Sequence, residues 1–213
     1  RRDALCLSAG GARAADTCSP TCTGGGGAPF VAPRDWLADR HLTKAKITWK
    51  EDVRHWHPGQ DWIWEPGGLG VFDPGINALS VLTAILPHAV HVSDAALHFP
   101  TNRDTPIAAD LTFHDPTGAE VTAAFDWLEQ GPPRWMIEIE THDGHAKLSE
   151  GGARFTPANG DEVAGKDEEY RRLYDRFAKL IARAESDVDL SPMRHVADAF
   201  TLGRRVAAPA FDW

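Results

Sequence analysis

Hydrophobic and polar residues alternate in several stretches of the chain, and this spacing predicts β-strands. In residues 44–52, Ala45, Ile47 and Trp49 share one side of the backbone and polar residues share the other, which is typical of a half-buried strand. Similar runs occupy residues 91–99, 106–114, 120–128, 135–141 and 146–155. Turn sequences at 115–118 and 142–145 join neighbouring runs, and such short links require antiparallel pairing.

A helical pattern begins within the glycine-rich stretch 64–77 and continues to about Leu86. Asp73 is expected to cap this helix, and Pro74 suits its first position, where a missing N–H costs nothing. Asn77 follows Asp73 by four residues, so the carboxylate and the amide project from one face of the helix. One interpretation of the pair is a helix cap and a surface amide, and the other is a shared functional site.

Two more helices are predicted near the end of the chain. The first begins after Asp167 and carries one apolar stripe, formed by Tyr170, Leu173, Tyr174, Phe177, Leu180 and Ile181. The second begins at residues 191–192 and turns Met193, Val196, Ala197 and Phe200 inward, with Arg204 and Arg205 near its end. Both stripes predict packing against a core. The order of elements predicts an α+β domain over residues 34–213, with helices on one face of an open, mainly antiparallel sheet.

Residues 1–33 differ from the rest of the chain, because they are rich in Gly, Ala, Ser and Thr and show almost no apolar periodicity. We expect this segment to be disordered, and one hypothesis is that it is out-of-frame or truncated sequence. Four consecutive glycines lack the flanking residues of a phosphate-binding loop. Cys6, Cys18 and Cys22 lie in the same segment without a second cysteine pair, so no metal site is predicted.

Composition narrows the classes of partner. The 213 residues carry a formal net charge of −9 and no dense basic run, which argues against a nucleic-acid partner. No apolar run approaches the ~20 residues that cross a bilayer, so no membrane partner is expected. The body after residue 33 contains no cysteine, which fits a reducing compartment and favours a cytoplasmic location.

The candidate chemistry gathers in a predicted loop, residues 54–72, which is unusually long for a compact domain and rich in Trp and His. Tryptophan faces stack on sugar rings, while carboxylates, amides and imidazoles bind vicinal hydroxyls. His55 and His57 are two apart on an extended segment, so only one of them can face a shared site, and they form a poor metal pair. A glycosidase pair drawn from the carboxylates of this region remains an alternative.

The segment Gly-Gly-Leu-Gly-Val-Phe-Asp-Pro-Gly-Ile-Asn at 67–77 resembles the Gly-Gly-Gly…Asp-x-Gly-x-His pattern of the Gfo/Idh/MocA oxidoreductases. More narrowly, residues 49–54, 56–60 and 62–68 resemble the aldose 1-dehydrogenase branch of that family, and Asn77 stands where many relatives have histidine. The resemblance implies an α+β C-terminal domain over about residues 36–213. It also implies oxidation of D-galactose or L-arabinose to the aldonolactone with NAD or NADP.

The resemblance further implies a role for individual side chains. Asp73 would take or orient the proton of the anomeric hydroxyl, and Asn77 would bind the same hydroxyl. Four other residues would bind the sugar: Glu51 and His57 through hydroxyl groups, and Trp56 and Trp135 against the ring. A base whose pKa lies near the working pH is what general-base catalysis requires.

The cofactor site of the family lies in an N-terminal Rossmann domain, with a glycine fingerprint and the lysine of a Glu-Lys-Pro motif. This sequence contains neither motif. The resemblance therefore implies that the chain alone binds no nicotinamide cofactor tightly and turns over no sugar. An alternative is a non-catalytic module that binds sugar or mediates homo-oligomerisation through the open sheet face.

Overall fold

The computed structural model describes residues 28–164, 169–186 and 188–213. Most of the segment that we predicted to be disordered, residues 1–27, lies outside the described residues, as does the predicted cap Asp167. Residues 28–33 belong instead to the first helix, α1 (Ala28–Ala38), so the predicted boundary at residue 33 was wrong. The helix is explained by Phe30 and Leu37, which are buried in the core.

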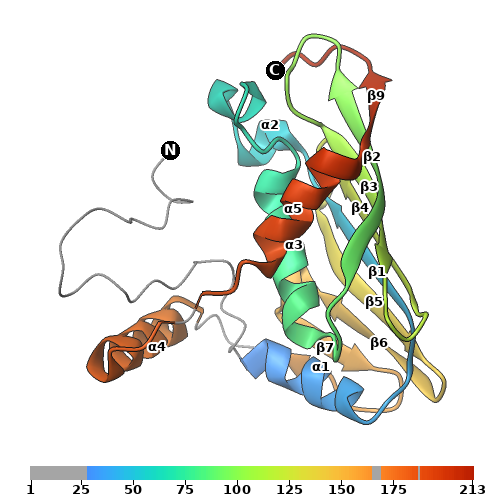
Figure 1. Cartoon of the computed structure of the whole chain (residues 1–213), viewed down its shortest axis with the longest axis vertical. Coiled ribbons are helices and arrows are strands. Elements are labelled where there is room, and N and C mark those ends of the chain that lie inside the picture. The colour runs from blue at the N-terminus through green and yellow to red at the C-terminus, as the bar shows by residue number, and fades with distance from the viewer. Residues whose placement is uncertain (1–27, 165–168, 187) are drawn as a thin grey trace.

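One mixed sheet of nine strands forms the centre of the fold, in the order β8-β7-β6-β5-β1-β4-β3-β2-β9 (Figure 1). The strands are β1 (Leu42–Lys50), β2 (His91–Pro100), β3 (Ala108–His114), β4 (Glu120–Asp126), β5 (Arg134–Thr141), β6 (Gly144–Ser149), β7 (Arg154–Pro157), β8 (Val163–Ala164) and β9 (Arg204–Ala208). Most neighbours are antiparallel, but β1 runs parallel to β4 and β2 runs parallel to β9. The α+β class and the mainly antiparallel sheet are confirmed.

Strand β1 shows how the alternation of the sequence orients the sheet. Ala45, Ile47 and Trp49 are buried on the face that meets the helices, as predicted. Since side chains alternate along a strand, Glu51 continues this face just beyond the end of β1. The strand pairs with β4 on one side and β5 on the other, so residues from three strands meet around Glu51.

Helices α3 (Phe72–Ile85) and α5 (Ser191–Leu202) pack on one face of the sheet, and no helix of the described residues lies on the opposite face (Figure 1). On α5, Val196 is buried as predicted, whereas Met193, Ala197 and Phe200 are exposed. The buried face of α5 instead includes His195 and Ala199. The arginines expected near the end of this helix belong to β9, which the sequence analysis missed.

Helix α4 (Glu169–Arg183) lies apart from the sheet and the other helices (Figure 1). Of its predicted core stripe, Leu180 is buried, but Tyr174, Phe177 and Ile181 are exposed, so the prediction of core packing was wrong for these three. The side chains of the first two stripe residues lie outside the described residues. Amphipathic spacing shows that a helix has an apolar face that can be buried, but it does not identify the surface that covers this face.

Two irregular regions depart from the predicted elements. The predicted loop 54–72 contains a short helix, α2 (Val53–Trp56), and a 3-10 turn, η1 (Asp61–Trp64). The predicted return strand 146–155 is divided into β6 and β7 by η2 (Glu150–Gly152), whose three residues have positive φ. A left-handed backbone of this kind ends a strand, and it was not visible in the alternation of apolar residues.

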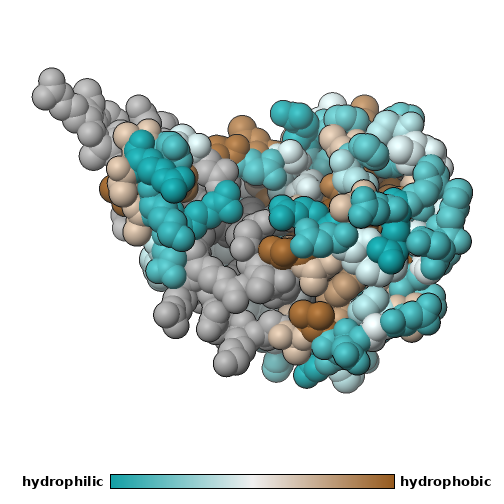
Figure 2. Space-filling view, turned by 90° about the horizontal axis from the view of Figure 1, so that it is seen from below, coloured by the Kyte–Doolittle hydropathy of each residue, from teal (hydrophilic) through white to brown (hydrophobic). Residues whose placement is uncertain are grey.

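The surface seen from below is mainly hydrophilic, with hydrophobic residues in patches between the polar ones (Figure 2). Among the described residues, no helix combines the length and the apolar character needed to span a bilayer.

Candidate functional site

The start of α3 delivers Asp73 to the end of β1, although the helix begins differently from our prediction. Its N-cap is Val71, whose N–H donates to the Pro106 carbonyl at 2.8 Å, and no side chain caps it. Asp73 is the second helical residue and Pro74 the third, so the predicted cap role of Asp73 was wrong. The Asp73 carboxylate is therefore free of capping bonds and is available to other groups.

The glycines before α3 are explained by close contacts within the chain. A Cβ on Gly70, whose φ is +55°, would lie 2.4 Å from the Pro106 carbonyl oxygen. A Cβ on Gly68 would lie 2.5 Å from the Ile63 carbonyl oxygen. These residues let the loop pack on its neighbours, and this packing fixes where α3 begins.

Asp73 and Asn77 lie one turn apart on α3, and both are half-buried. Between them Gly75 is buried, and a Cβ there would lie 3.2 Å from the Phe125 ring of β4. The helix can therefore approach the sheet closely at this turn. The Asn77 amide makes no hydrogen bond to any residue in the described part of the chain, which leaves its donor and acceptor available to a ligand.

Glu51 is a buried carboxylate held by two indole groups. Its side chain is only 4% exposed. The Trp135 indole N–H donates to one carboxylate oxygen at 2.7 Å, and the Trp127 indole N–H donates to the other at 3.3 Å. Trp127 directly follows β4 and Trp135 lies in β5, so the two strands that flank β1 each supply one donor.

His57 lies between the two carboxylates. Its Nε2 is 3.9 Å from Glu51 Oε1, and its Nδ1 is 3.8 Å from Asp73 Oδ2. The imidazole also contacts the Trp127 ring, with centroids 5.3 Å apart. His55 is exposed and meets only the edge of Trp56 among the aromatic contacts of this region. The chain thus forms a Glu51–His57–Asp73 row in which the imidazole links two acids.

Burial raises the pKa of both carboxyl groups in this row. Desolvation is the largest cause for Glu51, and its pKa rises although the Trp135 and Trp127 hydrogen bonds and His57 act in the opposite direction. Desolvation also raises the pKa of Asp73, and His57 partly offsets it. A carboxylate with a raised pKa is a better proton acceptor, and this combination is typical of acid–base sites.

An aromatic surface flanks the row. Trp56, at the end of α2, is 43% exposed and packs against Trp135 with centroids 5.0 Å apart. Trp135 in turn stacks on Trp49 at 5.9 Å. An exposed indole beside buried carboxylates offers an apolar face next to hydrogen-bonding groups, which suits a ligand with both kinds of surface, such as a sugar.

Most of the predicted site residues lie in one continuous set of contacts. The contacts run in the order Asp73, His57, Glu51, Trp135 and Trp56, and each residue lies against the next. Asn77 joins them only through its place on α3, one turn from Asp73. Trp127 was not predicted as a site residue, because the alternation of residues 120–128 indicates only that its ring is buried and gives no sign of where its N–H points.

No group of three or more His, Cys, Asp or Glu side chains is arranged to hold a metal ion in the described part of the chain.

The chain is similar to proteins of one kind in both sequence and structure, although no protein-family model matches it. It is 46% identical over 182 residues to a galactose 1-dehydrogenase from Pseudomonas fluorescens, and the match covers 85% of this chain and 60% of that protein. The crystal structure of a D-galactose-1-dehydrogenase from Rhizobium etli matches with a TM-score of 0.83 and 48% identity, covering 91% of this chain and 62% of that one. The chain therefore spans about three fifths of the length of these relatives.

A more distant structure shows the same fold. A 3-ketoreductase from Actinomadura kijaniata, solved in complex with NADP, matches with a TM-score of 0.64 at 12% identity and covers 84% of this chain and 58% of that one.

Proposed function

We propose that this chain, which belongs with the galactose 1-dehydrogenases of the Gfo/Idh/MocA type, forms the substrate-binding part of an aldose 1-dehydrogenase. The reaction would oxidise the C1 hydroxyl of a sugar such as D-galactose or L-arabinose to the lactone. The observation that supports this proposal most directly is the Glu51–His57–Asp73 row beside the exposed face of Trp56.

Asp73 is the proposed acceptor of the proton from the anomeric hydroxyl. Its carboxylate makes no capping bond, it is partly open to solvent, and its raised pKa makes it a stronger base than an ordinary aspartate. Asn77, on the same helix face, would donate or accept a hydrogen bond with that hydroxyl. His57, 3.8 Å from the Asp73 carboxylate and 3.9 Å from the Glu51 carboxylate, would partly offset the negative charge of both.

The burial of Glu51 favours a different role from the direct sugar contact that the resemblance implied. Both of its oxygens already accept an indole N–H, and little of its surface is open to a ligand. We assign it to orienting His57, in the way that a buried acid commonly holds an imidazole. Trp56 and His57 then remain as the side chains that would contact the sugar directly, with Trp135 behind Trp56.

NAD or NADP would accept the hydride in the complete enzyme, and we propose that the described residues do not hold the dinucleotide tightly. The glycines at 68 and 70 pack against the backbone of Ile63 and Pro106, which leaves no open cradle for a pyrophosphate there. The sequence also has no dinucleotide fingerprint. We therefore propose that these 213 residues alone do not catalyse the oxidation.

Fusion of residues 28–213 to the dinucleotide-binding part of a galactose 1-dehydrogenase tests the proposal. We expect the fusion to reduce NAD or NADP in the presence of galactose or arabinose, and the unfused chain to give no more than the blank rate. Activity of the fusion should be lost in Asp73→Ala and reduced in Asn77→Ala. Turnover that is independent of Asp73, or sugar hydrolysis without any nicotinamide, would refute the assignment and favour another enzyme class.

A further inference from the structure

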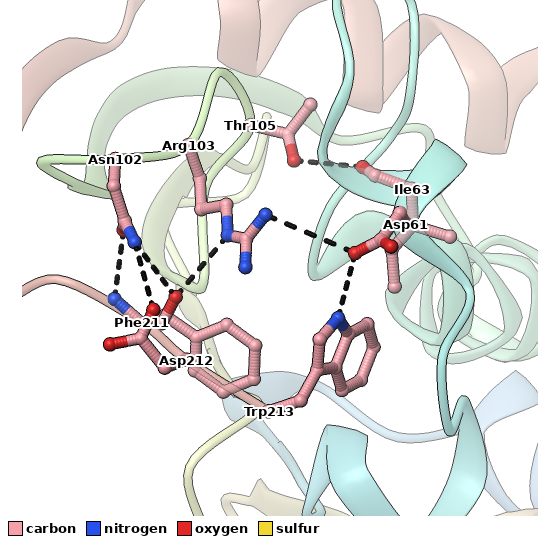
Figure 3. A network of polar contacts seen from close by, with 8 residues as sticks. All are labelled: Asp61, Ile63, Asn102, Arg103, Thr105, Phe211, Asp212 and Trp213. Atoms are coloured by element: carbon pink, nitrogen blue, oxygen red, sulfur yellow. Dashed lines mark hydrogen bonds and ion pairs between the residues drawn. The ribbon is translucent and has the colours of Figure 1, made fainter.

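Residues 209–213, which follow β9, lie against the segment that carries His57 (Figure 3). Phe211 is 2% exposed, and the Asn102 side chain binds both polar groups of its backbone: the amide donates to the Phe211 carbonyl at 3.0 Å and accepts the Phe211 N–H at 2.9 Å. The Arg103 Nε donates to the same carbonyl at 3.3 Å. The turn after β2 therefore holds residue 211 in a fixed place.

The same short stretch is tied to the α2–η1 segment, which we define as residues 53–64. Arg54 of α2 donates to the Asp212 carbonyl at 3.1 Å, and its guanidinium lies 4.7 Å from the Phe211 ring centroid. Asp61 of η1 accepts the Trp213 indole N–H at 2.7 Å and lies 3.9 Å from the Arg103 guanidinium. Asp61 thus connects three parts of the chain at one carboxylate (Figure 3).

An unbroken series of ring contacts leads from residues 209–213 to the row of site residues. The Phe211 ring packs on Trp64 at 4.9 Å, and Trp64 packs on Trp127 at 5.2 Å. Trp127 in turn donates its N–H to Glu51 and contacts the His57 ring. Packed rings therefore connect Phe211 to Trp127, and both Trp127 and its partner Glu51 lie beside His57.

We infer that residues 209–213 act as a clamp that positions the α2–η1 segment, and with it His57 and Trp56, over the start of α3. This inference rests on the proposed function for its catalytic meaning. The clamp residues are positioning residues, since none of them is in contact with Asp73, Asn77 or the exposed face of Trp56 in the structure. Asp61 and Trp213 are the most accessible of its contacts.

We expect the clamp to affect the local mobility of residues 53–64 more than the global free energy of unfolding. Asp61 and Trp213 are exposed, so the contacts between them and Arg103 contribute little to the global free energy of unfolding. Each contact nevertheless restrains a segment that has little regular structure of its own, only one short helix and one 3-10 turn. Loss of the clamp should therefore loosen residues 53–64 locally and leave the sheet unchanged.

The clamp can be tested with two variants of the full chain, Asp61→Ala and Asp61→Asn. The alanine variant removes the acceptor for Trp213, whereas the asparagine variant keeps an oxygen acceptor there. We expect amide hydrogen exchange in residues 57–64 to speed up about tenfold in Asp61→Ala. Galactose affinity, measured by calorimetry, should fall by about the same factor because His57 and Trp56 are no longer held. Asp61→Asn should stay close to the wild-type values in both measurements.

Phe155→Leu is the control for a general loss of stability. Phe155 is buried in β7, near the opposite end of the sheet, where it meets the edge of Trp36. This variant should lower Tm without changing exchange in residues 57–64 or galactose affinity.

The inference is overturned if Asp61→Ala leaves exchange in residues 57–64 unchanged, if Phe155→Leu speeds that exchange equally, or if exchange rises while galactose affinity stays the same. If the wild-type chain binds no sugar, the proposed function fails, and the exchange result alone then decides whether the clamp exists.

Discussion

At the scale of single residues, the site depends on two carboxyl groups, Glu51 and Asp73, whose ionised forms lose favourable hydration because they are buried. Glu51 keeps its place because two indole N–H groups and an imidazole surround it. Within the described part of the chain, the His57 imidazole lies 3.8 Å from the Asp73 carboxylate and partly offsets its charge, and that carboxylate does not cap α3. Such groups reduce stability when they are ionised, which is a common cost of a functional site.

Asp73→Asn should therefore stabilise the chain at neutral pH while removing the proposed proton acceptor. The folded-state pKa of Asp73 is raised above its ordinary value of 3.8, so folding disfavours the ionised form. The penalty is absent below the unfolded pKa, develops as pH rises through the folded pKa, and is complete above it. Thermal denaturation should give a higher Tm for the variant at pH 8 and equal Tm values near pH 3. A lower Tm for the variant at pH 8 would contradict the burial argument.

Trp135→Phe should destabilise the chain, because it removes the shorter of the two hydrogen bonds to the Glu51 carboxylate. A buried charged acceptor that loses a donor costs about 1–3 kcal/mol. Urea unfolding should show a loss of that size, together with a further rise in the pKa of Glu51. Trp127→Phe removes the longer bond of 3.3 Å, but Trp127 is fully buried, so the cavity left behind should make its total loss larger than that of Trp135→Phe. Equal stability of Trp135→Phe and wild type would argue against the bond.

At the scale of elements, the alternation of residues 44–52 predicted β1 and its buried face correctly, since that pattern reports directly on burial. The same alternation placed Glu51 near the end of this strand, and the helical pattern that begins in residues 64–77 placed Asp73 near the start of α3. The cap Val71 was not predictable, because it depends on the long-range bond from its N–H to Pro106. The short helix α2 does have a local signal, since the Asp52 side chain caps it by accepting the Arg54 N–H, but that signal was overlooked. The role of Trp127 was hidden for the same reason: a spacing rule identifies a buried ring and not the direction of its N–H.

Gly70→Ala should test how the loop sets the start of α3. The new Cβ would clash with the Pro106 carbonyl, and alanine is also unfavourable at a φ of +55°. Gly59→Ala is the control, because Gly59 has a similar φ of +68° but open space around its Cβ position. We expect the control to cost only the backbone penalty of about 1–2 kcal/mol and Gly70→Ala to cost clearly more in denaturant unfolding. Equal losses would show that the close approach to Pro106 does not matter.

At the scale of the whole molecule, α3 and α5 cover one face of the sheet, and no helix in the described part of the chain covers the other (Figure 1). The outward side chains of β4 include Thr122 and Ala124, which are half-buried by their neighbours. Ion pairs such as Lys44–Glu120 lie at the margin of this face. A broad sheet face with small residues near its middle suits contact with a second copy of the chain, and we propose that it forms a homo-oligomer interface.

Ala124→Arg should dissociate such an oligomer, because it places an unpaired charge in the middle of the interface. Sedimentation velocity should show a dimer or larger species for the wild type and a monomer for the variant. Thr122→Ser is a suitable control, since it alters the same face without adding charge. A monomeric wild type at micromolar concentrations would exclude the proposed interface.

Calorimetric titration of the chain with D-galactose and L-arabinose tests directly whether these residues hold the sugar. We expect saturable binding of at least one of the two sugars. Asp73→Ala should abolish this binding, and Phe155→Leu, at the far end of the sheet, should keep it. Absence of binding to the folded wild-type chain, or binding that is unaffected by Asp73→Ala, would contradict the assignment of the site.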